Sequence, residues 1–397
     1  MNPMLSARLQ AVKPSATLAI TARVGVLRAA GHDVIGLGGG EPDFDTPEHI
    51  KAAAIAAIQA GKTKYTAVDG TVELKQAIVD KFARDNQLDY TLKQVLVSCG
   101  GKQSFYNLAQ AILGAGDEVI IPAPYWVSYP DMVLLADAKP VIVPTLASQD
   151  FKLTAAQLAA AITPKTRLLV LNSPSNPTGM MYTAAELSAL GAVIRQHPHV
   201  MLATDDMYEH VVWQAGSMQN IVQVCPDLYE RTLVLNGVSK AYSMTGWRIG
   251  YAAGPEMIIQ AMKKVQSQST SNPASISQAA AEAALSGPQD CIGEMVAAFK
   301  QRHDYVVERL SALPGVECKP TDGTFYVFPS LAGLIKRLPG IQDDVQLVEH
   351  LIERAGIAGV PGTAFGQPDY VRFSVATSQE NLHKGMDRLE AYVKAHG

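Results

Sequence analysis

Cysteine is scarce in this chain of 397 residues, and no two cysteines stand close together. The four are Cys99, Cys225, Cys291 and Cys318. They form no Cys-x-x-Cys pair, and the histidines form no His-Glu-x-x-His motif. These absences argue against a metal centre, and scattered single thiols are typical of a reducing cytoplasm. We therefore expect no bound metal and a cytoplasmic location.

Long apolar runs and basic runs are missing as well. No apolar run approaches the ~20 residues that a membrane helix needs, and the first residues (MNPMLSARLQAVKPSATLAI) lack the basic and apolar regions of a secretory signal. The formal net charge is -4, and no stretch of Lys and Arg resembles a nucleic-acid-binding segment. We expect neither a membrane nor a nucleic acid as a partner.

Apolar material is plentiful by contrast. Hydrophobic residues make up 48% of the chain, which is ordinary for a globular protein and sufficient for a large core. Since a domain holds roughly 100 to 200 residues, the length predicts two or more structural units.

Between about residues 90 and 255, short β-branched runs alternate with turns and helical stretches. This alternation is typical of a parallel sheet covered by helices. The seven predicted strands are 94–98, 118–122, 140–144, 167–172, 200–204, 231–236 and 248–253. The predicted helices between them are 103–113, 129–136 and 183–197. Open α/β sheets bind ligands at the carboxyl ends of their strands, so the chemistry is expected there.

After Pro273 the pattern changes to that of a smaller α+β unit. A long helical stretch is predicted over 276–313, followed by a helix over 345–355. The predicted strands of this unit are near 323–328 and 370–376, and the early segment 34–40 could add another.

Lys240 follows a buried-type strand and precedes Arg248 by a short polar loop. Taken alone, such a lysine is most often a solvated surface residue. A lysine at a strand end can also form an imine with a carbonyl compound, and a nearby guanidinium can bind an anionic group. Together the two residues suggest pyridoxal phosphate as a cofactor.

Such a cofactor requires further groups at the neighbouring strand ends. Asp205 ends the strand 200–204 and can keep the pyridine nitrogen protonated, whereas Asp206 would point the other way in an extended chain. Tyr208 and Asn176 can donate to the phenolate oxygen of the ring. Asp205 could equally cap a helix, and Asn176 could equally serve a turn.

The remaining cofactor groups would come from the first two strand ends. Trp126 offers a stacking surface, and 100–103 (GGKQ) opens a helix whose amides can bind a phosphate. Trp126 could instead belong to the core, and the glycines could form only a tight turn.

Two glycine-rich segments match nucleotide-binding motifs only in part. The segment 36–40 (GLGGG) suggests a dinucleotide fingerprint, but Glu41 stands where the last glycine is required. Gly101 and Lys102 suggest a P-loop, but Gln103 replaces its Ser or Thr. Neither segment therefore predicts a nucleotide site.

Taken together, the motifs resemble the fold-type I, pyridoxal-phosphate-dependent class I/II aminotransferases over essentially the whole chain. The matching motifs are 173–179 (SPSNPTG), Asp205 with Tyr208, Ser239 with Lys240, and 246–250 (GWRIG). A second set is similar to the bacterial branch called subgroup 1b, which includes aspartate/prephenate aminotransferases. This set consists of 13–17 (KPSAT), 40–47 (GEPDFDTP), 61–65 (GKTKY), 100–103 (GGKQ) and 124–130 (PYWVSYP).

The resemblance implies an α/β fold with a large domain on a mainly parallel seven-stranded sheet and a smaller α+β domain. We expect an N-terminal arm over 1–13, the first part of the small domain over 14–45, and the large cofactor-binding domain over 46–282. A linking helix and the rest of the small domain would occupy 283–397.

For the cofactor, pyridoxal 5′-phosphate, the resemblance assigns one role to each strand-end residue. Lys240 would bind it covalently and later move a proton between the substrate α-carbon and the cofactor. Asp205 would hold the ring nitrogen, Tyr208 and Asn176 the 3′-oxygen, and Trp126 the ring face. The phosphate would be held by Gly101, Lys102, Gln103, Ser239, Arg248 and by Tyr65 of the partner subunit in a homodimer.

For the substrate, the resemblance assigns the α-carboxylate to Arg372, near the backbone of Gly39 or Gly40, and places Trp126 and Asn176 beside it. The side-chain carboxylate would be bound by Lys102 with Ser15 and Thr17, and Lys13 matches a lysine associated with prephenate use. Better-known aspartate aminotransferases use a partner-subunit arginine four residues before the serine of a Ser-Asn-Pro motif, and here that position is Ser267.

The expected reaction is transfer of the amino group of L-aspartate to 2-oxoglutarate, which gives oxaloacetate and L-glutamate in a ping-pong cycle. The alternatives are an aminotransferase for prephenate, aromatic or other amino acids, or a lyase with the same cofactor. A regulator that uses this fold as an effector domain would need a DNA-binding segment, and the short stretch before Lys13 offers none.

Overall fold

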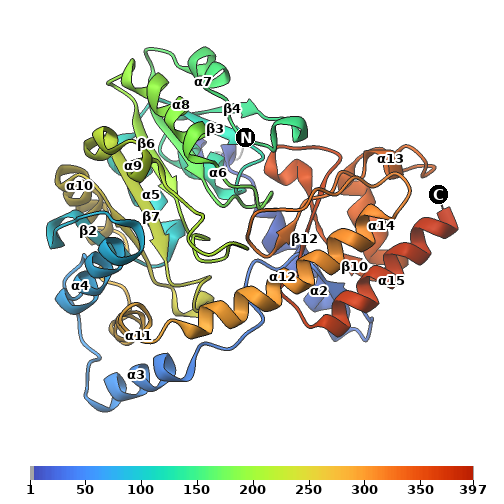
Figure 1. Cartoon of the computed structure of the whole chain (residues 1–397), viewed down its shortest axis with the longest axis horizontal. Coiled ribbons are helices and arrows are strands. Elements are labelled where there is room, and N and C mark those ends of the chain that lie inside the picture. Colours follow the sequence, from blue (N-terminus) through green and yellow to red (C-terminus); the bar gives the residue numbers. More distant parts are fainter. Residues whose placement is uncertain (1–3, 397) are drawn as a thin grey trace.

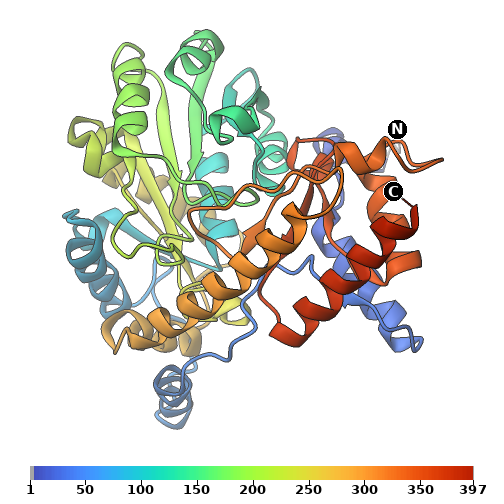
Figure 2. The same cartoon turned by 45° about the vertical axis from the view of Figure 1, so that its right-hand side comes forward.

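A computed structural model describes residues 4–396, which form a large α/β part and a small α+β part (Figure 1). The large part holds the long strands, and the small part holds the C-terminal helices. The turned view in Figure 2 shows the two parts side by side, with helix α12 (Asp290–Ser311) running from one to the other. The domain boundaries at 13/14, 45/46 and 282/283 stay predictions.

One sheet of seven strands forms the centre of the large part, in the order β2-β8-β7-β6-β5-β3-β4. Neighbouring strands are parallel, except that β8 is antiparallel to both β2 and β7. The strands are β2 (Val95–Ser98), β3 (Glu118–Ala123), β4 (Lys139–Pro144), β5 (Thr166–Asn172), β6 (Met201–Asp205), β7 (Thr232–Gly237) and β8 (Gly250–Ala253). The prediction of a mainly parallel seven-stranded sheet is confirmed.

Strand β8 begins two residues later than the sequence pattern predicts. Arg248 has a φ of 55°, which lies in the left-handed region and cannot belong to an extended strand. The chain therefore turns at Arg248 before it enters the sheet at Gly250.

Helices cover both faces of this sheet, as its continuous apolar strands require. Alternate strand residues enter different cores: Leu202 belongs to the core that includes residues of α4 and α8, whereas Ala203 belongs to the core that includes residues of α5, α6 and α10. These helices are α4 (Val72–Lys81), α5 (Gly101–Ile112), α6 (Ser128–Leu135), α8 (Ala184–Arg195) and α10 (Glu256–Ser267). The three helices predicted between the strands are confirmed as α5, α6 and α8.

The small part has its own core and two short sheets. Its elements are α2 (Ala16–Ala29), β1 (Ile35–Gly36), β9 (Tyr326–Val327), α14 (Asp344–Ala355), β10 (Ile357–Ala358), β11 (Val360–Pro361), β12 (Val371–Ser374) and α15 (Gln379–His396). Strand β12 lies between β9 and β11, and β1 pairs in parallel with β10. The early strand expected within 34–40 is therefore confirmed as a member of this unit.

The single helical stretch expected over 276–313 is wrong in one respect. The chain forms two helices there, α11 (Ser275–Ser286) and α12, with Gly287 and Pro288 between them. Proline lacks the backbone donor that a continuous helix needs and pushes the residue before it out of helical geometry.

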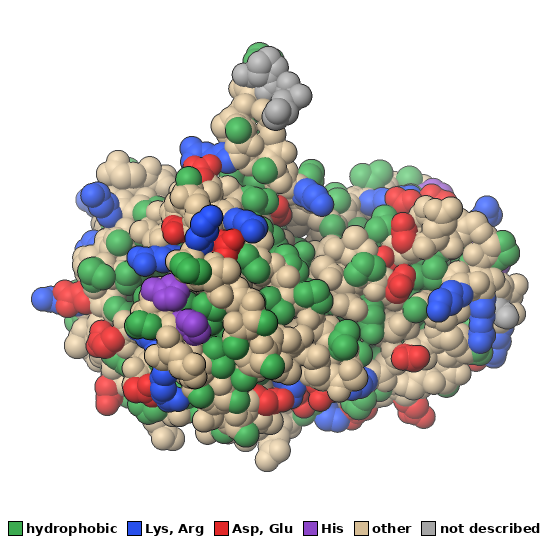
Figure 3. Space-filling view, turned by 90° about the horizontal axis from the view of Figure 1, so that it is seen from above, with side chains coloured by type: hydrophobic (Ala, Val, Ile, Leu, Met, Phe, Trp, Pro, Cys, Tyr) green, Lys and Arg blue, Asp and Glu red, His purple; other side chains and the backbone are tan. Residues whose placement is uncertain are grey.

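The first described residues project from the body of the molecule (Figure 3). Helix α1 (Ala7–Ala11) buries none of its residues, and Met4 is 87% exposed. No helix within residues 4–396 combines the length and the apolar character needed to cross a membrane.

Candidate active site between the two parts

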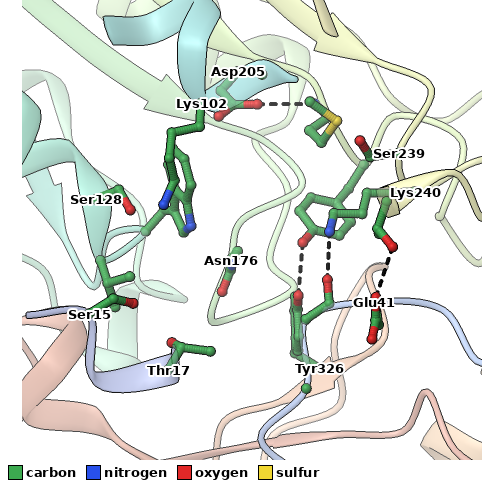
Figure 4. Close-up of a pocket in the computed structure, with 18 of the residues that line it drawn as sticks. Ser15, Thr17, Glu41, Lys102, Ser128, Asn176, Asp205, Ser239, Lys240 and Tyr326 are labelled. Carbon is green, nitrogen blue, oxygen red and sulfur yellow. Dashed lines mark hydrogen bonds between the residues drawn. The ribbon is translucent and has the colours of Figure 1, made fainter. Parts of the chain in front are cut away.

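A cavity of about 370 Å³ opens between the carboxyl edge of the large sheet and the small part (Figure 4). Most residues predicted for the site line it, although they come from distant segments. These residues are Ser15, Thr17, Gly39, Gly40, Gly101, Lys102, Trp126, Asn176, Asp205, Tyr208, Ser239, Lys240, Arg248 and Arg372. The structure therefore brings 14 of the 17 predicted site residues into one cavity.

Lys240 lies just beyond the end of β7, and its side chain is half-buried in the cavity wall. Its Nζ donates to the carbonyl oxygen of Gly40 at 2.5 Å, so the lysine spans from the large sheet to the N-terminal segment. Burial, together with the charges of Arg372 and Arg248, lowers the pKa of Lys240 to about 8. A substantial fraction of this amine is thus neutral near physiological pH.

Asp205 is the last residue of β6 and Asp206 follows it, and their side chains point in opposite directions. Asp205 faces the cavity, where Oδ2 accepts from the Tyr129 hydroxyl at 2.5 Å and Oδ1 accepts from the Met207 amide at 3.2 Å. Burial raises the pKa of Asp205, and these donors oppose the rise. Asp206 bonds instead to Thr204 and Asn220 and lies outside the cavity lining.

A glycine turn and an arginine form one end of the cavity. Helix α5 begins at Gly101, so its free amides point toward the cavity end. Arg248 packs on this turn, and its Nη2 donates to the Cys99 carbonyl oxygen at 3.3 Å. A Cβ on Gly100 would lie 2.2 Å from that Nη2. The helix start and the guanidinium together suit an anion such as a phosphate.

Arg372 forms a second cationic locus, and it is only 2% exposed. Its Nη1 donates to Asn176 Oδ1 and its Nη2 donates to the Gly38 carbonyl oxygen, both at 2.8 Å. Its Nε has no hydrogen-bond partner, and it forms no ion pair within residues 4–396. A buried arginine without a carboxylate is costly unless an anion binds there.

Lys102 provides a third cationic locus beside Trp126, with Nζ 5.3 Å from the ring centroid. Burial lowers the pKa of Lys102, and the charge of Arg248 adds to this effect. Ser15 and Thr17 lie across the cavity from it, at the start of α2 (Figure 4). This group of donors suits a second carboxylate at a distance from Arg372.

Three predicted site residues lie outside the cavity lining. The side chain of Gln103 bonds to the Cys99 amide and to Thr270, so it stabilises the glycine turn. Lys13 is exposed. Tyr65 is 92% exposed, as expected of a residue that would act in a neighbouring subunit.

The sequence reasoning missed several residues of the site. Tyr129 supports Asp205, and Tyr326, Glu41 and Thr245 line the cavity, where Thr245 donates to Glu41 at 2.8 Å. Glu41 lies in the motif 40–47 and Tyr129 in the motif 124–130, so their place in the sequence indicated that they could belong to the site. Tyr326 lies in a predicted strand outside these motifs, and nothing in the sequence indicated a role in the site.

A substitution at Gly250 tests how closely this residue packs against the glycine turn at Gly100 and Gly101. A Cβ there would lie 2.3 Å from the Gly101 amide nitrogen, and this backbone cannot move without displacing the start of α5. We expect Gly250→Ala to lower the free energy of unfolding by about 1–3 kcal/mol, measured by urea denaturation. Gly246→Ala is the matched control, because nothing lies within 4 Å of its Cβ, and it should leave stability unchanged. Equal stability of the two variants would contradict this packing.

The amine of Lys240 should lose its proton at a much lower pH than the amine of an ordinary lysine. In the cofactor-free protein, where the amine of Lys240 is unlinked, competitive acetylation followed by mass spectrometry should place its half-reactivity at a pH of about 8, against ~10.4 for a lysine in an unfolded peptide. The Arg372→Gln variant should titrate at a higher pH, because a positive charge that lowers the pKa is removed. If the wild-type Lys240 reached half-reactivity at a pH near that of the peptide lysine, the lowered pKa of Lys240 would be refuted.

Residues 32–389 match the family described as aminotransferase class I and II. Among curated relatives, the aspartate/prephenate aminotransferase of Nitrosomonas europaea is 54% identical over 97% of this chain and 98% of the relative. The aspartate aminotransferase of Geobacillus stearothermophilus is 49% identical over 98% of this chain and 99% of the relative.

Solved structures agree with these relatives. The aspartate aminotransferase of Rhizobium meliloti superposes with a TM-score of 0.95 at 49% identity, covering 98% of both chains. The aspartate aminotransferase of Thermus thermophilus, solved with maleate, superposes with a TM-score of 0.92 at 44% identity, covering 98% of this chain and 99% of that one.

Proposed function

The chain belongs to the class I and II aminotransferase family, and we propose that it transfers the amino group of L-aspartate to 2-oxoglutarate with pyridoxal 5′-phosphate as cofactor. The observation that carries this proposal is the cavity itself. The cavity contains Lys240, whose pKa is lowered, the carboxylate of Asp205, and the start of α5, which suits an anion. It also contains two further cationic side chains, those of Arg372 and Lys102.

The donor set of the cavity fits this cofactor group by group. Lys240 suits its aldehyde carbon, Asp205 its pyridine nitrogen, and Trp126 the face of its ring. Its phosphate suits the start of α5 together with Arg248. When bound, the cofactor withdraws electrons from the substrate α-carbon and so makes its proton acidic.

The protein residues then have defined tasks in the reaction. Lys240, once displaced by the substrate, would accept the proton of the substrate α-carbon and donate it to the carbon of the cofactor that carries the transferred amino group. Its pKa of about 8 suits both steps, because such a group gives and takes protons readily near neutral pH. Asp205 would lie beside the ring nitrogen, and its bonds to Tyr129 and Met207 hold it in place.

The separation of Arg372 from Lys102 supports a dicarboxylate as substrate. Arg372 would take the α-carboxylate through its fork of donors, one of which is unpaired. Lys102, with Ser15 and Thr17, would take the second carboxylate. The Thermus relative was solved with maleate, which is itself a dicarboxylate.

Prephenate is a second candidate as amino acceptor. The Nitrosomonas relative is named for both aspartate and prephenate. Prephenate also carries two carboxylates, so it could use the same two cationic loci. Lys13 lies outside the described cavity lining but near α6, since its amide bonds to Asp131, and we propose it as a contributor to prephenate use.

We also propose a homodimer in which Tyr65 completes the phosphate site of the partner subunit. The exposure of Tyr65, together with the projecting apolar residues of the N-terminal segment, supports an interface there. Analytical ultracentrifugation should give twice the mass of one chain, and a monomer mass would contradict this proposal.

The half-reaction tests the proposed function directly. Stoichiometric L-aspartate should convert the absorbance of the bound cofactor from the lysine-linked form to the amino form and release one equivalent of oxaloacetate. 2-Oxoglutarate should then restore the first spectrum. Release of ammonia or CO2 with an unchanged spectrum would indicate a lyase.

Lys102 determines the preference for dicarboxylates in this proposal. Lys102→Met should raise the KM for aspartate about 10- to 100-fold, the usual effect of losing a charged hydrogen bond, and should change the KM for alanine far less. Arg372→Gln is the matched comparison and should impair both amino acids, since both carry an α-carboxylate. Cofactor occupancy is measured in each variant, and equal losses for the two amino acids in Lys102→Met would remove the specificity argument.

A further inference from the structure

Tyr326 connects the small part to the cofactor-binding side of the cavity. It stands on β9, next to the strand that carries Arg372, and it is 1% exposed. Its hydroxyl oxygen lies 2.9 Å from that of Tyr208, which belongs to the large part (Figure 4). Both tyrosines line the cavity, yet the sequence motifs point only to Tyr208.

The direction of this hydrogen bond decides what Tyr208 can do. Each phenol has one proton, so only one of the two hydroxyls can donate across the 2.9 Å contact. If Tyr326 donates, the proton of Tyr208 is free to bond to an oxygen in the cavity. If Tyr208 donates, it has no proton left for that oxygen.

Arg372 favours donation by Tyr326. Its guanidinium carbon lies 4.2 Å from the centroid of the Tyr326 ring. A positive charge at this distance makes a phenol more acidic and therefore a better donor. Burial raises the pKa of both tyrosines and the charge of Arg372 opposes the rise in both, but the pKa of Tyr208 is raised well above its ordinary value and that of Tyr326 less so.

We propose that Tyr326 is a positioning residue that donates to Tyr208 and so directs the Tyr208 proton at the anionic 3′-oxygen of the cofactor. This inference rests on the proposed function, because it requires the cofactor to be bound at Lys240. It adds a second task to β9 and β12, which would hold the carboxylate-binding arginine and also control the donor to the cofactor oxygen.

Tyr326→Phe tests the proposal, because it removes the hydroxyl and keeps the ring beneath Arg372. Without the donor, Tyr208 stabilises the cofactor oxygen less, so the Lys240-linked nitrogen beside that oxygen holds its proton more tightly. We expect the pKa read from the absorbance of the bound cofactor to rise by about 0.5. We also expect cofactor binding, followed by tryptophan fluorescence of the cofactor-free protein, to weaken about threefold. The KM for aspartate should change less than twofold.

A double-mutant cycle with Tyr208→Phe separates this role from general packing. In the Tyr208→Phe background, adding Tyr326→Phe should change neither the spectroscopic pKa nor cofactor affinity, because the receiving hydroxyl is gone. The control is Tyr392→Phe on α15, which removes a hydroxyl 2.7 Å from His350 of α14, outside the cavity lining. It should leave both quantities at their wild-type values.

Three outcomes would overturn the proposal. Tyr326→Phe could match the wild type in both quantities, it could shift them equally in the Tyr208→Phe background, or Tyr392→Phe could shift them as much. The proposed function fails separately, if the wild-type protein binds the cofactor at Lys240 but aspartate does not convert it. In that case the pKa and affinity readouts still test Tyr326.

Discussion

The seven-stranded sheet is buried on both faces, and this constraint decides where polar chemistry can occur in the large part. Strand β7 has no exposed residue, and its side chains enter two separate apolar cores. An unpaired polar group in either core would cost several kcal/mol. Polar side chains therefore gather where the strands end, and at the carboxyl ends they meet the small part across one cavity.

The small part completes the site through contacts that cross from one part to the other. Lys240 bonds to Gly40, Arg372 bonds to Asn176, and Tyr326 contacts Tyr208. Each contact joins a residue expected to hold the cofactor with a segment that would hold the substrate. A displacement of the small part would thus change the surroundings of both molecules together.

Sequence reasoning reached the sheet and most of the site because its signals are local. The period of two along β6 was enough to separate Asp205 from Asp206, and the strand ends located Lys240 and Trp126. Tyr326 was missed because its role arises from a contact 118 residues away, with Tyr208. The break between α11 and α12 was missed although Gly287 and Pro288 are a local signal for the end of a helix. The role assigned to each site residue still rests on the family resemblance.

Burial lowers the pKa of the two lysines in the cavity, and the charge balance of the cavity adds to this effect. Lys102, Lys240, Arg248 and Arg372 line it, and the opposing carboxylates of the lining are Asp205 and Glu41. The cations repel one another, and each arginine lowers the pKa of at least one lysine. A phosphate and two carboxylates would offset this excess of positive charge. The repulsion that adds to burial in lowering the pKa of Lys240 thus also favours an anionic cofactor and a dianionic substrate.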